Sequence, residues 1–310
     1  MAYGDSIYFD VDQGIKADSG FWYKCVQHLG TGGNAATYLV VGSDGPYRGV
    51  LFALKVFRKL SEAKRRESFL QEVGFLHKCS HPSVMRIFDT GTYRIPMLSQ
   101  AREYPFVVAE YLPTTLAEVI RANNASMPAR ISYALQLLSG LAYLSGLNPP
   151  VVHRDIKPQN IFVKGYSCVL GDFGLRKVLD GKADTTREVF NESASAGMLF
   201  FYRTPDLVAY VKDGAPLSAK SDVFQLGLVL TELFTGRNPL KRAEDLLDPI
   251  VLEAMNAIPG ALGGGIASLL WRMLVSDPVT RENAATLLSP WQGVFSDAVG
   301  RATELAGRVF

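Results

Sequence analysis

Short apolar runs separated by turn-forming residues occupy the first third of the chain. Residues 21–29 are largely apolar and aromatic, residues 37–41 form a β-rich run, and residues 50–57 form another after a Gly-Ser-Asp-Gly-Pro turn. Runs of this kind, bounded by glycine and aspartate, are typical of strands joined by tight turns. We therefore expect three consecutive strands here, and two more at residues 84–88 and 106–111.

The period of the hydrophobic pattern changes within residues 62–79. From Phe69 onward, apolar residues recur at i, i+4 and i+7, which places them on one face of a helix. Glu72 lies beside that face. Between the last two predicted strands, we expect residues 91–103 to form a long loop insertion.

The remainder of the chain has helical character. Residues 131–144 and 222–234 are apolar at helical spacing, and the second segment is apolar almost all round, as in a buried helix. Residues 290–310 carry a further apolar stripe, which we expect to pack on these helices. The pattern predicts a small sheet-rich unit followed by a larger helical one, with the join near residues 110–113.

Composition and charge narrow the class of protein. Of the 310 residues, 48% are hydrophobic and 20% are charged, which is ordinary for a soluble globular protein. The net charge of +2 argues against a nucleic-acid binder. No segment approaches the ~20 apolar residues that span a bilayer, and the polar start is unlike a signal peptide. We therefore expect a cytoplasmic protein, or the cytoplasmic domain of a larger one, with no membrane contact by this chain.

The cysteines argue against two further classes of protein, those held by disulfides and those that bind a zinc cluster. Cys25, Cys79 and Cys168 are more than fifty residues apart and form no CxxC unit. Three cysteines cannot all pair with one another, and without a CxxC unit a disulfide scaffold or a zinc cluster is not expected. We expect reduced thiols in the core.

A glycine cluster, Gly30-Thr-Gly-Gly-Asn-Ala35, lies between two predicted strands. By itself such a cluster is usually a turn. Backbone without side chains can also close over phosphate groups and donate N–H bonds to them. The cluster becomes informative through the motifs that follow it in order: Phe52-Ala-Leu-Lys55, Glu72, His153-Arg-Asp-Ile-Lys-Pro-Gln-Asn160, Asp172-Phe-Gly174, Thr204-Pro-Asp206, Ser221-Asp-Val-Phe-Gln-Leu-Gly227 and Asp277-Pro-Val-Thr-Arg281.

From about residue 21 to residue 288, this order of motifs resembles the eukaryotic-type (Hanks-type) Ser/Thr protein kinase catalytic domain. The resemblance implies an α+β, bilobal protein-kinase-like fold, with an antiparallel sheet and one helix in the N-lobe and a larger, mainly helical C-lobe. After an N-terminal extension at residues 1–20, the kinase domain would span residues 21–310. Its N-lobe would cover about residues 21–110, its hinge about 110–113 and its C-lobe about 114–310.

The resemblance also implies an activity. Such a domain transfers the γ-phosphate of ATP to Ser/Thr hydroxyls of proteins with Mg²⁺, or Mn²⁺ as an alternative, and often phosphorylates its own activation segment. Asp155 would accept the hydroxyl proton, Lys157 would steady the γ-phosphate, and Lys55, fixed by Glu72, would hold the α- and β-phosphates. Asn160 and Asp172 would bind the metal. The nucleotide would further contact Gly30, Thr31, Gly32, Gly33, Thr37, Ala53, Ala109, Glu110, Leu112 and Phe162.

Other positions carry structural or regulatory implications of the same resemblance. His153 would pack in the core of the domain, with Asp222 as an anchor, and Asp206 would form a buried ion pair with Arg281. Arg154 and Lys177 would bind a phosphate on Ser195 in the activation segment. The alternative is a polar loop without a switch. Leu199 departs from the pattern, because such kinases usually carry a threonine there.

Three interpretations stay open on the sequence. The first is an active protein kinase whose partner is a protein substrate, with another copy of the chain as one such substrate. The second is a kinase-like scaffold that only binds partners. The complete set Lys55, Glu72, Asp155, Asn160 and Asp172 argues against it. The third is a small-molecule kinase of related fold, against which the motif His153-Arg-Asp155 and the later motifs argue.

Overall fold

The structure, a computed structural model, describes residues 7–32, 35–58, 73–74, 77, 79–96, 101–171, 201–215, 217–245 and 247–307, with side chains up to residue 301. The contacts divide the chain into two units. Unit 1 comprises Met1–Ser80 and Met85–Leu112, and unit 2 comprises His81–Val84 and Pro113–Phe310.

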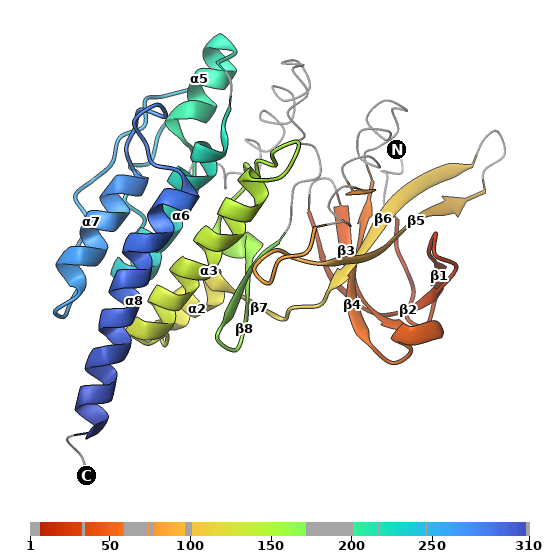
Figure 1. Ribbon diagram of the computed structural model, residues 1–310. Helices are drawn as coiled ribbons and strands as arrows, with labels where there is room; N and C mark the ends of the chain where they lie inside the picture. Colours follow the sequence, from red (N-terminus) through yellow and green to blue (C-terminus); the bar gives the residue numbers. More distant parts are fainter. Residues whose placement is uncertain are drawn as a thin grey trace. The chain divides into compact units, whose positions relative to one another are not determined.

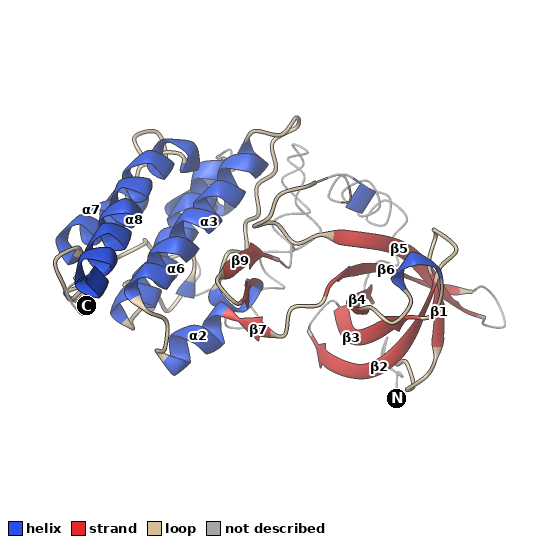
Figure 2. Cartoon of the chain, turned by 60° about the horizontal axis from the view of Figure 1, so that its bottom comes forward, coloured by secondary structure: helices blue, strands red, loops and turns tan. Residues whose placement is uncertain are grey.

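Unit 1 is built on one curved, antiparallel sheet (Figures 1 and 2). The strand order is β1-β2-β3-β4-β6-β5, and a short 3-10 helix, η1 (Gly45–Tyr47), follows the third strand. The predicted strands at residues 21–29, 37–41, 50–57 and 106–111 are confirmed within a residue or two at most ends. The strands are β1 (Gly14–Lys16), β2 (Trp22–Thr31), β3 (Ala35–Gly42), β4 (Leu51–Phe57), β5 (Ile87–Ile95) and β6 (Arg102–Glu110).

Strand alternation gives this sheet two different faces. Tyr38, Leu54 and Val108 are at most 1% exposed and belong to one hydrophobic core cluster. Successive side chains of a strand point to opposite faces. The neighbouring positions Thr37 and Lys55 therefore lie on the other face, outside that core.

The loop predicted for residues 91–103 is largely wrong. β5 continues to Ile95 and β6 begins at Arg102, so both ends of this segment belong to a hairpin. Gly91, where the predicted loop begins, lies in the middle of β5 opposite Phe106. A Cβ atom at this glycine would be 2.3 Å from the Phe106 ring, so the glycine is required by the ring that covers it.

The strand predicted at residues 84–88 is displaced. β5 begins only at Ile87, and Val84 forms an isolated bridge to Leu170 within unit 2. The helix predicted for residues 62–79 lies mostly outside the described residues. Glu72 also lies outside them.

Unit 2 is mainly helical and confirms the predicted helices. In Figure 1, α3, α6 and α8 lie side by side, and each contacts a neighbour in this group. A small sheet with the order β7-β8-β9 accompanies them. The elements are β7 (Thr114–Thr115), α2 (Leu116–Ala122), α3 (Met127–Ser145), η2 (Pro158–Asn160), β8 (Ile161–Lys164), β9 (Ser167–Leu170), α5 (Pro205–Asp213), α6 (Ala219–Thr235), α7 (Gly263–Met273) and α8 (Ala284–Gly307).

Local signals explain where these helices begin and end. The hydroxyls of Ser126, Thr204 and Ser218 accept backbone N–H bonds at the starts of α3, α5 and α6, which satisfies donors that a helix leaves open. Gly214 and Gly236 end α5 and α6 at φ values of 70° and 76°, a conformation that favours glycine.

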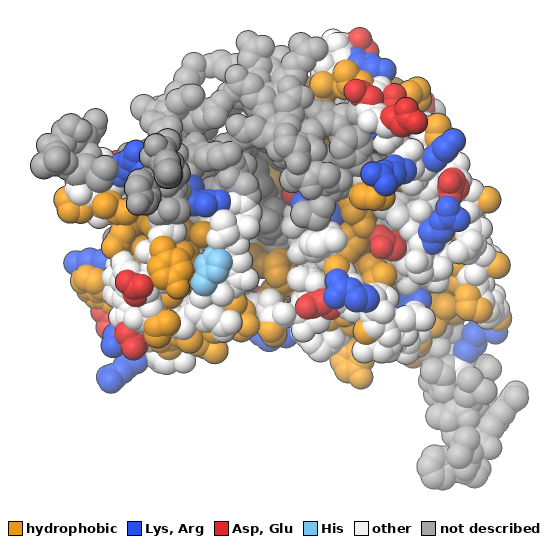
Figure 3. All heavy atoms as spheres, turned by 180° about the vertical axis from the view of Figure 1, so that it is seen from behind, with side chains coloured by type: hydrophobic (Ala, Val, Ile, Leu, Met, Phe, Trp, Pro, Cys, Tyr) orange, Lys and Arg blue, Asp and Glu red, His pale blue; other side chains and the backbone are white. Residues whose placement is uncertain are grey.

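All three cysteines are buried and form no disulfide, as the sequence predicts. Burial raises the pKa of the Cys168 thiol well above its ordinary range. Within the described part of the chain, none of the helices has the length and apolar character required to traverse a bilayer. On the face shown in Figure 3, acidic and basic side chains of the described residues are interspersed.

Candidate active site

The glycine cluster forms the turn of the β2–β3 hairpin in unit 1. β2 ends at Thr31 and β3 begins at Ala35, and the Gly32 N–H donates to the Ala35 carbonyl over 2.9 Å. A Cβ atom at Gly30 would meet none of the described residues within 4 Å, so there is room beside the backbone at the end of β2. Gly33 lies outside the described residues.

Three strands bring four of the predicted nucleotide residues of unit 1 together. In the sheet register, Thr37 of β3 lies opposite Lys55 of β4, and Ala53 lies opposite Ala109 of β6. Alternation places all four on the same face, the one turned away from the core cluster of unit 1. We call Thr37, Ala53, Lys55 and Ala109 the nucleotide face.

The predicted hinge residues come directly after Ala109 in the chain. Glu110 is the last residue of β6, and its N–H donates to the Arg86 carbonyl over 3.1 Å. Leu112 is buried and is the last residue of unit 1. Phe162, predicted to contact the adenine, lies in β8 of unit 2.

In unit 2, side chains of α6 hold the backbone of the loop that carries Asp155. The Asp222 carboxylate accepts the N–H groups of His153 and Arg154, both over 2.7 Å. The Gln225 amide accepts from the Ile156 N–H over 3.0 Å, and its Nε2 donates to the Arg154 carbonyl. Since Asp222 and Gln225 are each 1% exposed, this support is part of the core.

Arg154 adopts a φ of 63°, which a residue other than glycine rarely takes. Its two backbone bonds to α6 hold it there. The anchoring role predicted for Asp222 is confirmed. The role of Gln225 was not predicted, although its position three residues after Asp222 places it on the same face of α6.

The Asp155 carboxylate is fixed by two neighbours. Lys157 Nζ lies 3.0 Å from Oδ2 and 3.1 Å from Oδ1, and Asn160 Nδ2 donates to Oδ2 over 2.8 Å. The Asp155 side chain keeps 27% of its surface exposed, and the Lys157 side chain keeps 17%. The carboxylate is therefore oriented but still accessible to a small reacting group.

Asn160 connects this carboxylate to the next motif. Its Nδ2 also donates to the Asp155 carbonyl over 2.9 Å, so Oδ1 takes no part in either bond. Its own carbonyl accepts from the Gly171 N–H over 2.9 Å. Gly171 directly precedes Asp172, but Asp172 itself, like Lys177, Ser195 and Leu199, lies outside the described residues.

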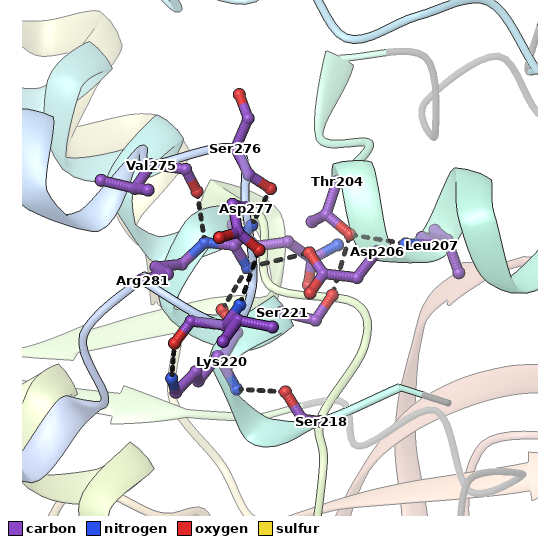
Figure 4. Close-up of polar contacts among 12 residues, drawn as sticks. Thr204, Asp206, Leu207, Ser218, Lys220, Ser221, Val275, Ser276, Asp277 and Arg281 are labelled. Atoms are coloured by element: carbon purple, nitrogen blue, oxygen red, sulfur yellow. Dashed lines mark hydrogen bonds and ion pairs between the residues drawn. The ribbon is translucent and has the colours of Figure 1, made fainter. Parts of the chain in front are cut away.

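The predicted pair of Asp206 and Arg281 is confirmed in the interior of unit 2 (Figure 4). The Arg281 guanidinium is 2.8 Å from Asp206 Oδ2, and their side chains are 0% and 2% exposed. The same guanidinium donates to the carbonyls of Val275, Ser276 and Lys220 and lies 4.9 Å from the centre of the Phe224 ring. Arg281 therefore has a structural role, because all of its partners belong to the packed core of unit 2 or to the loops beside it.

Comparisons with known proteins agree with this arrangement. The family described as the protein kinase domain matches residues 23–291. A probable serine/threonine-protein kinase of Dictyostelium discoideum is 33% identical over 227 residues, covering 73% of this chain and 12% of that protein. A probable serine/threonine-protein kinase of Corynebacterium efficiens is 30% identical over 227 residues, covering 71% of this chain and 31% of that protein.

The serine/threonine-protein kinase CTR1 of Arabidopsis thaliana is 29% identical over 250 residues, covering 76% of this chain and 28% of that protein. The chain thus spans less than a third of the length of each of these three relatives.

Proposed function

Because the chain belongs to the protein kinase domain family, we propose that it transfers the γ-phosphate of ATP to serine and threonine hydroxyls of proteins. The observation that carries this proposal is the fixed, accessible Asp155 carboxylate between Lys157 and Asn160. Phosphoryl transfer depends mainly on positioning and on neutralising charge. The names of the serine/threonine kinases to which the chain is similar support the choice of acceptor.

The catalytic loop supplies the proton acceptor for this reaction. The substrate hydroxyl oxygen forms a bond to the γ-phosphorus, the bond from that phosphorus to the bridging oxygen of ADP breaks, and the hydroxyl proton passes to Asp155. Lys157 Nζ, held beside the carboxylate at 3.0 Å, brings positive charge to the transferred phosphoryl group. General-base assistance of this kind is typically worth about 10²–10⁴-fold.

The nucleotide face of unit 1 supplies the binding groups. Ala53 and Thr37 offer small side chains against which a flat adenine can lie, and Lys55 offers an ammonium to the phosphates. The hairpin turn carries no side chain at Gly30 and Gly32, so phosphate groups can approach its backbone closely.

The chemistry of Asn160 fits a divalent cation. Its Nδ2 is bonded to Asp155 twice, which leaves the amide oxygen as the atom that can face a metal. Mg²⁺ prefers hard oxygen ligands, and Asp172 would supply the second one. When bound, the cation neutralises charge on the β- and γ-phosphates.

The direct test is transfer of labelled γ-phosphate to the chain itself and to a generic protein, followed by identification of the phosphorylated amino acids. We expect phosphoserine and phosphothreonine from the unmodified chain, and a loss of label with Lys55→Met or after chelation of the cation. Bound nucleotide without any transfer would contradict the proposal and favour a scaffold. Label on a small molecule alone would favour a small-molecule kinase.

We also propose that the chain phosphorylates its own activation segment, with Arg154 and Lys177 as the cations that bind phosphate on Ser195. Such a phosphate makes about one to three charge-assisted hydrogen bonds and orders a loop. Mass spectrometry after incubation with ATP and Mg²⁺ should find phosphate between Asp172 and Asp206. An unmodified but fully active enzyme would contradict self-phosphorylation without affecting the kinase assignment.

A further inference from the structure

Residues 7–20 precede the segment that matches the kinase family, which begins at residue 23. Four of their apolar side chains are nevertheless part of the unit 1 core. Phe9 is 1% exposed, Ile15 is 0% exposed, and Ile7 and Ala17 are 4% and 6% exposed. These four side chains are therefore buried as fully as the core residues of the sheet.

Hydrogen bonds connect the segment to β2 at one edge of the sheet. β1 pairs antiparallel with β2, and before it the Asp12 N–H donates to the Cys25 carbonyl over 2.8 Å. The Cys25 N–H in turn donates to the Gln13 carbonyl over 3.0 Å. These bonds satisfy backbone groups that an exposed edge strand would leave open.

The same segment reaches β5, which is the strand at the opposite end of the sheet order. The Asp18 N–H donates to the Thr90 carbonyl over 2.7 Å, and Gln13 Nε2 donates to the Tyr93 hydroxyl over 2.6 Å. The Ser19 hydroxyl also donates to Asp89. Residues 7–20 thus join the two edges of the curved sheet, a connection that Figure 2 allows the reader to follow.

Between these two edges, the segment packs against the core face of β3. The Phe9 ring lies 4.9 Å from the rings of both Tyr38 and Tyr93, measured between centroids. The Tyr38 hydroxyl donates to the Ile7 carbonyl over 3.3 Å. Tyr38 directly follows Thr37 in β3, so the two side chains lie on opposite faces of the same strand.

We infer that residues 7–20 form a strap that holds the nucleotide face in its binding geometry, with Phe9 as the main positioning residue. This inference rests on the proposed function. Phe9 fills the space behind β3, so Thr37 and the adjacent glycine turn cannot shift without opening a cavity in the core. A face that is held in place before the nucleotide arrives binds it with a smaller ordering cost.

The test compares Phe9→Ala with Tyr8→Ala. Tyr8 is the neighbouring aromatic residue of the strap, but it is 66% exposed. The affinity for ATP is measured by calorimetry on the full chain, well below the melting temperature of each variant. We expect the dissociation constant to rise about tenfold for Phe9→Ala, equivalent to ~1.4 kcal/mol, and to change less than twofold for Tyr8→Ala.

A merely structural role predicts a different result. In that case Phe9→Ala lowers the melting temperature, but the folded protein binds ATP with unchanged affinity, and this outcome would overturn the inference. If Phe9→Ala does not fold, Phe9→Leu keeps an apolar side chain and allows the same comparison with Tyr8→Ala. If the unmodified chain binds no nucleotide, the proposed function fails, and the inference fails with it.

Discussion

At the scale of single residues, the guanidinium of Arg281 is fully buried. It forms its ion pair with Asp206 where both side chains are shielded from water. Removing one partner of a buried pair leaves the other charge uncompensated, which typically costs about 3–5 kcal/mol. We predict that Arg281→Met lowers the free energy of unfolding by that amount in urea denaturation.

The matched control for this prediction is Arg272→Met. Arg272 pairs with Glu282, but their side chains are 38% and 28% exposed. Surface pairs contribute about 0–1 kcal/mol, so we expect a small effect. Equal losses for the two variants would show that burial does not set the strength of these interactions.

Ala109 determines the room available at one end of the nucleotide face. It lies opposite Ala53 on one side and Ile87 on the other, so its neighbours there are also modest in size. We predict that the protein is sensitive to ATP-competitive inhibitors with a bulky aromatic arm, and that Ala109→Met raises their inhibitory concentration at least tenfold. An unchanged potency, with ATP affinity also unchanged, would show that the arm does not approach Ala109.

The sequence predicted only some of the residues that form the candidate site. Asp155, Lys157 and Asn160 lie close together in the sequence, and their order resembles that of a known family, so their grouping could be expected. Gln225 was missed, because its role depends on a contact with the Ile156 N–H, 69 residues away in the chain. The spacing from Asp222 places Gln225 on the same face of α6, but it does not identify the N–H group that the side chain contacts.

At the scale of elements, the hairpin of β5 and β6 depends on a glycine that fits beneath an aromatic ring. A Cβ atom at Gly91 would lie 2.3 Å from the buried Phe106 ring, so Gly91→Ala must displace core side chains. Overpacking of this kind costs about 1–3 kcal/mol. We predict a loss of that size in the free energy of unfolding.

Gly293→Ala is the control for the hairpin variant. Gly293 is an exposed residue of α8, and a Cβ atom there would meet no atom within 4 Å. Alanine is favoured over glycine in helices by about 1 kcal/mol, so this variant should be neutral or stabilising. If Gly91→Ala were equally harmless, the close approach to Phe106 would be contradicted.

The burial of His81 should make the stability of the folded protein depend on pH. Its Nδ1 accepts the Ser83 N–H over 3.1 Å, its Nε2 lies 3.1 Å from the Ser139 hydroxyl, and its ring stacks on Tyr143. Burial lowers the pKa of the imidazole below its ordinary value of 6.5. The unfolded chain therefore takes up a proton near pH 6.5, whereas the folded chain does so only at lower pH, and stability falls as the pH decreases through that interval.

We predict that the His81 imidazole titrates below pH 6.5 in NMR spectra of the folded protein. His81→Gln should lose less stability than the unmodified chain between pH 7.5 and pH 5.5, because one group that resists protonation is gone. The same loss in both proteins, together with a titration midpoint above 6.5, would contradict this account of His81.

The elements that were predicted correctly are those with a strong local pattern. The apolar segments that became β4 and α6 have the length and spacing of their structures. β1 was missed because it has only three residues, and its stability depends on pairing with β2. The outer half of the hairpin was missed, because its pairing brings Gly91 against the Phe106 ring, a tertiary contact that the local sequence does not indicate.

At the scale of the whole molecule, the two units carry different parts of the proposed chemistry. Unit 1 presents the nucleotide face, backed by its core and by the strap. Unit 2 presents Asp155 on a loop that α6 holds from within the core. The sequence predicted this division between a sheet-rich part and a helical part, since each has its own hydrophobic period.

The central claim is that Asp155 acts as the proton acceptor of a protein kinase. The most direct measurement is the rate of γ-phosphate transfer to a protein substrate at saturating ATP and Mg²⁺, compared between the unmodified chain and Asp155→Asn, with nucleotide affinity measured in parallel. The account predicts a rate lower by about 10²–10⁴-fold with nearly unchanged affinity. Equal rates, or nucleotide binding by the unmodified chain without any transfer, would contradict it.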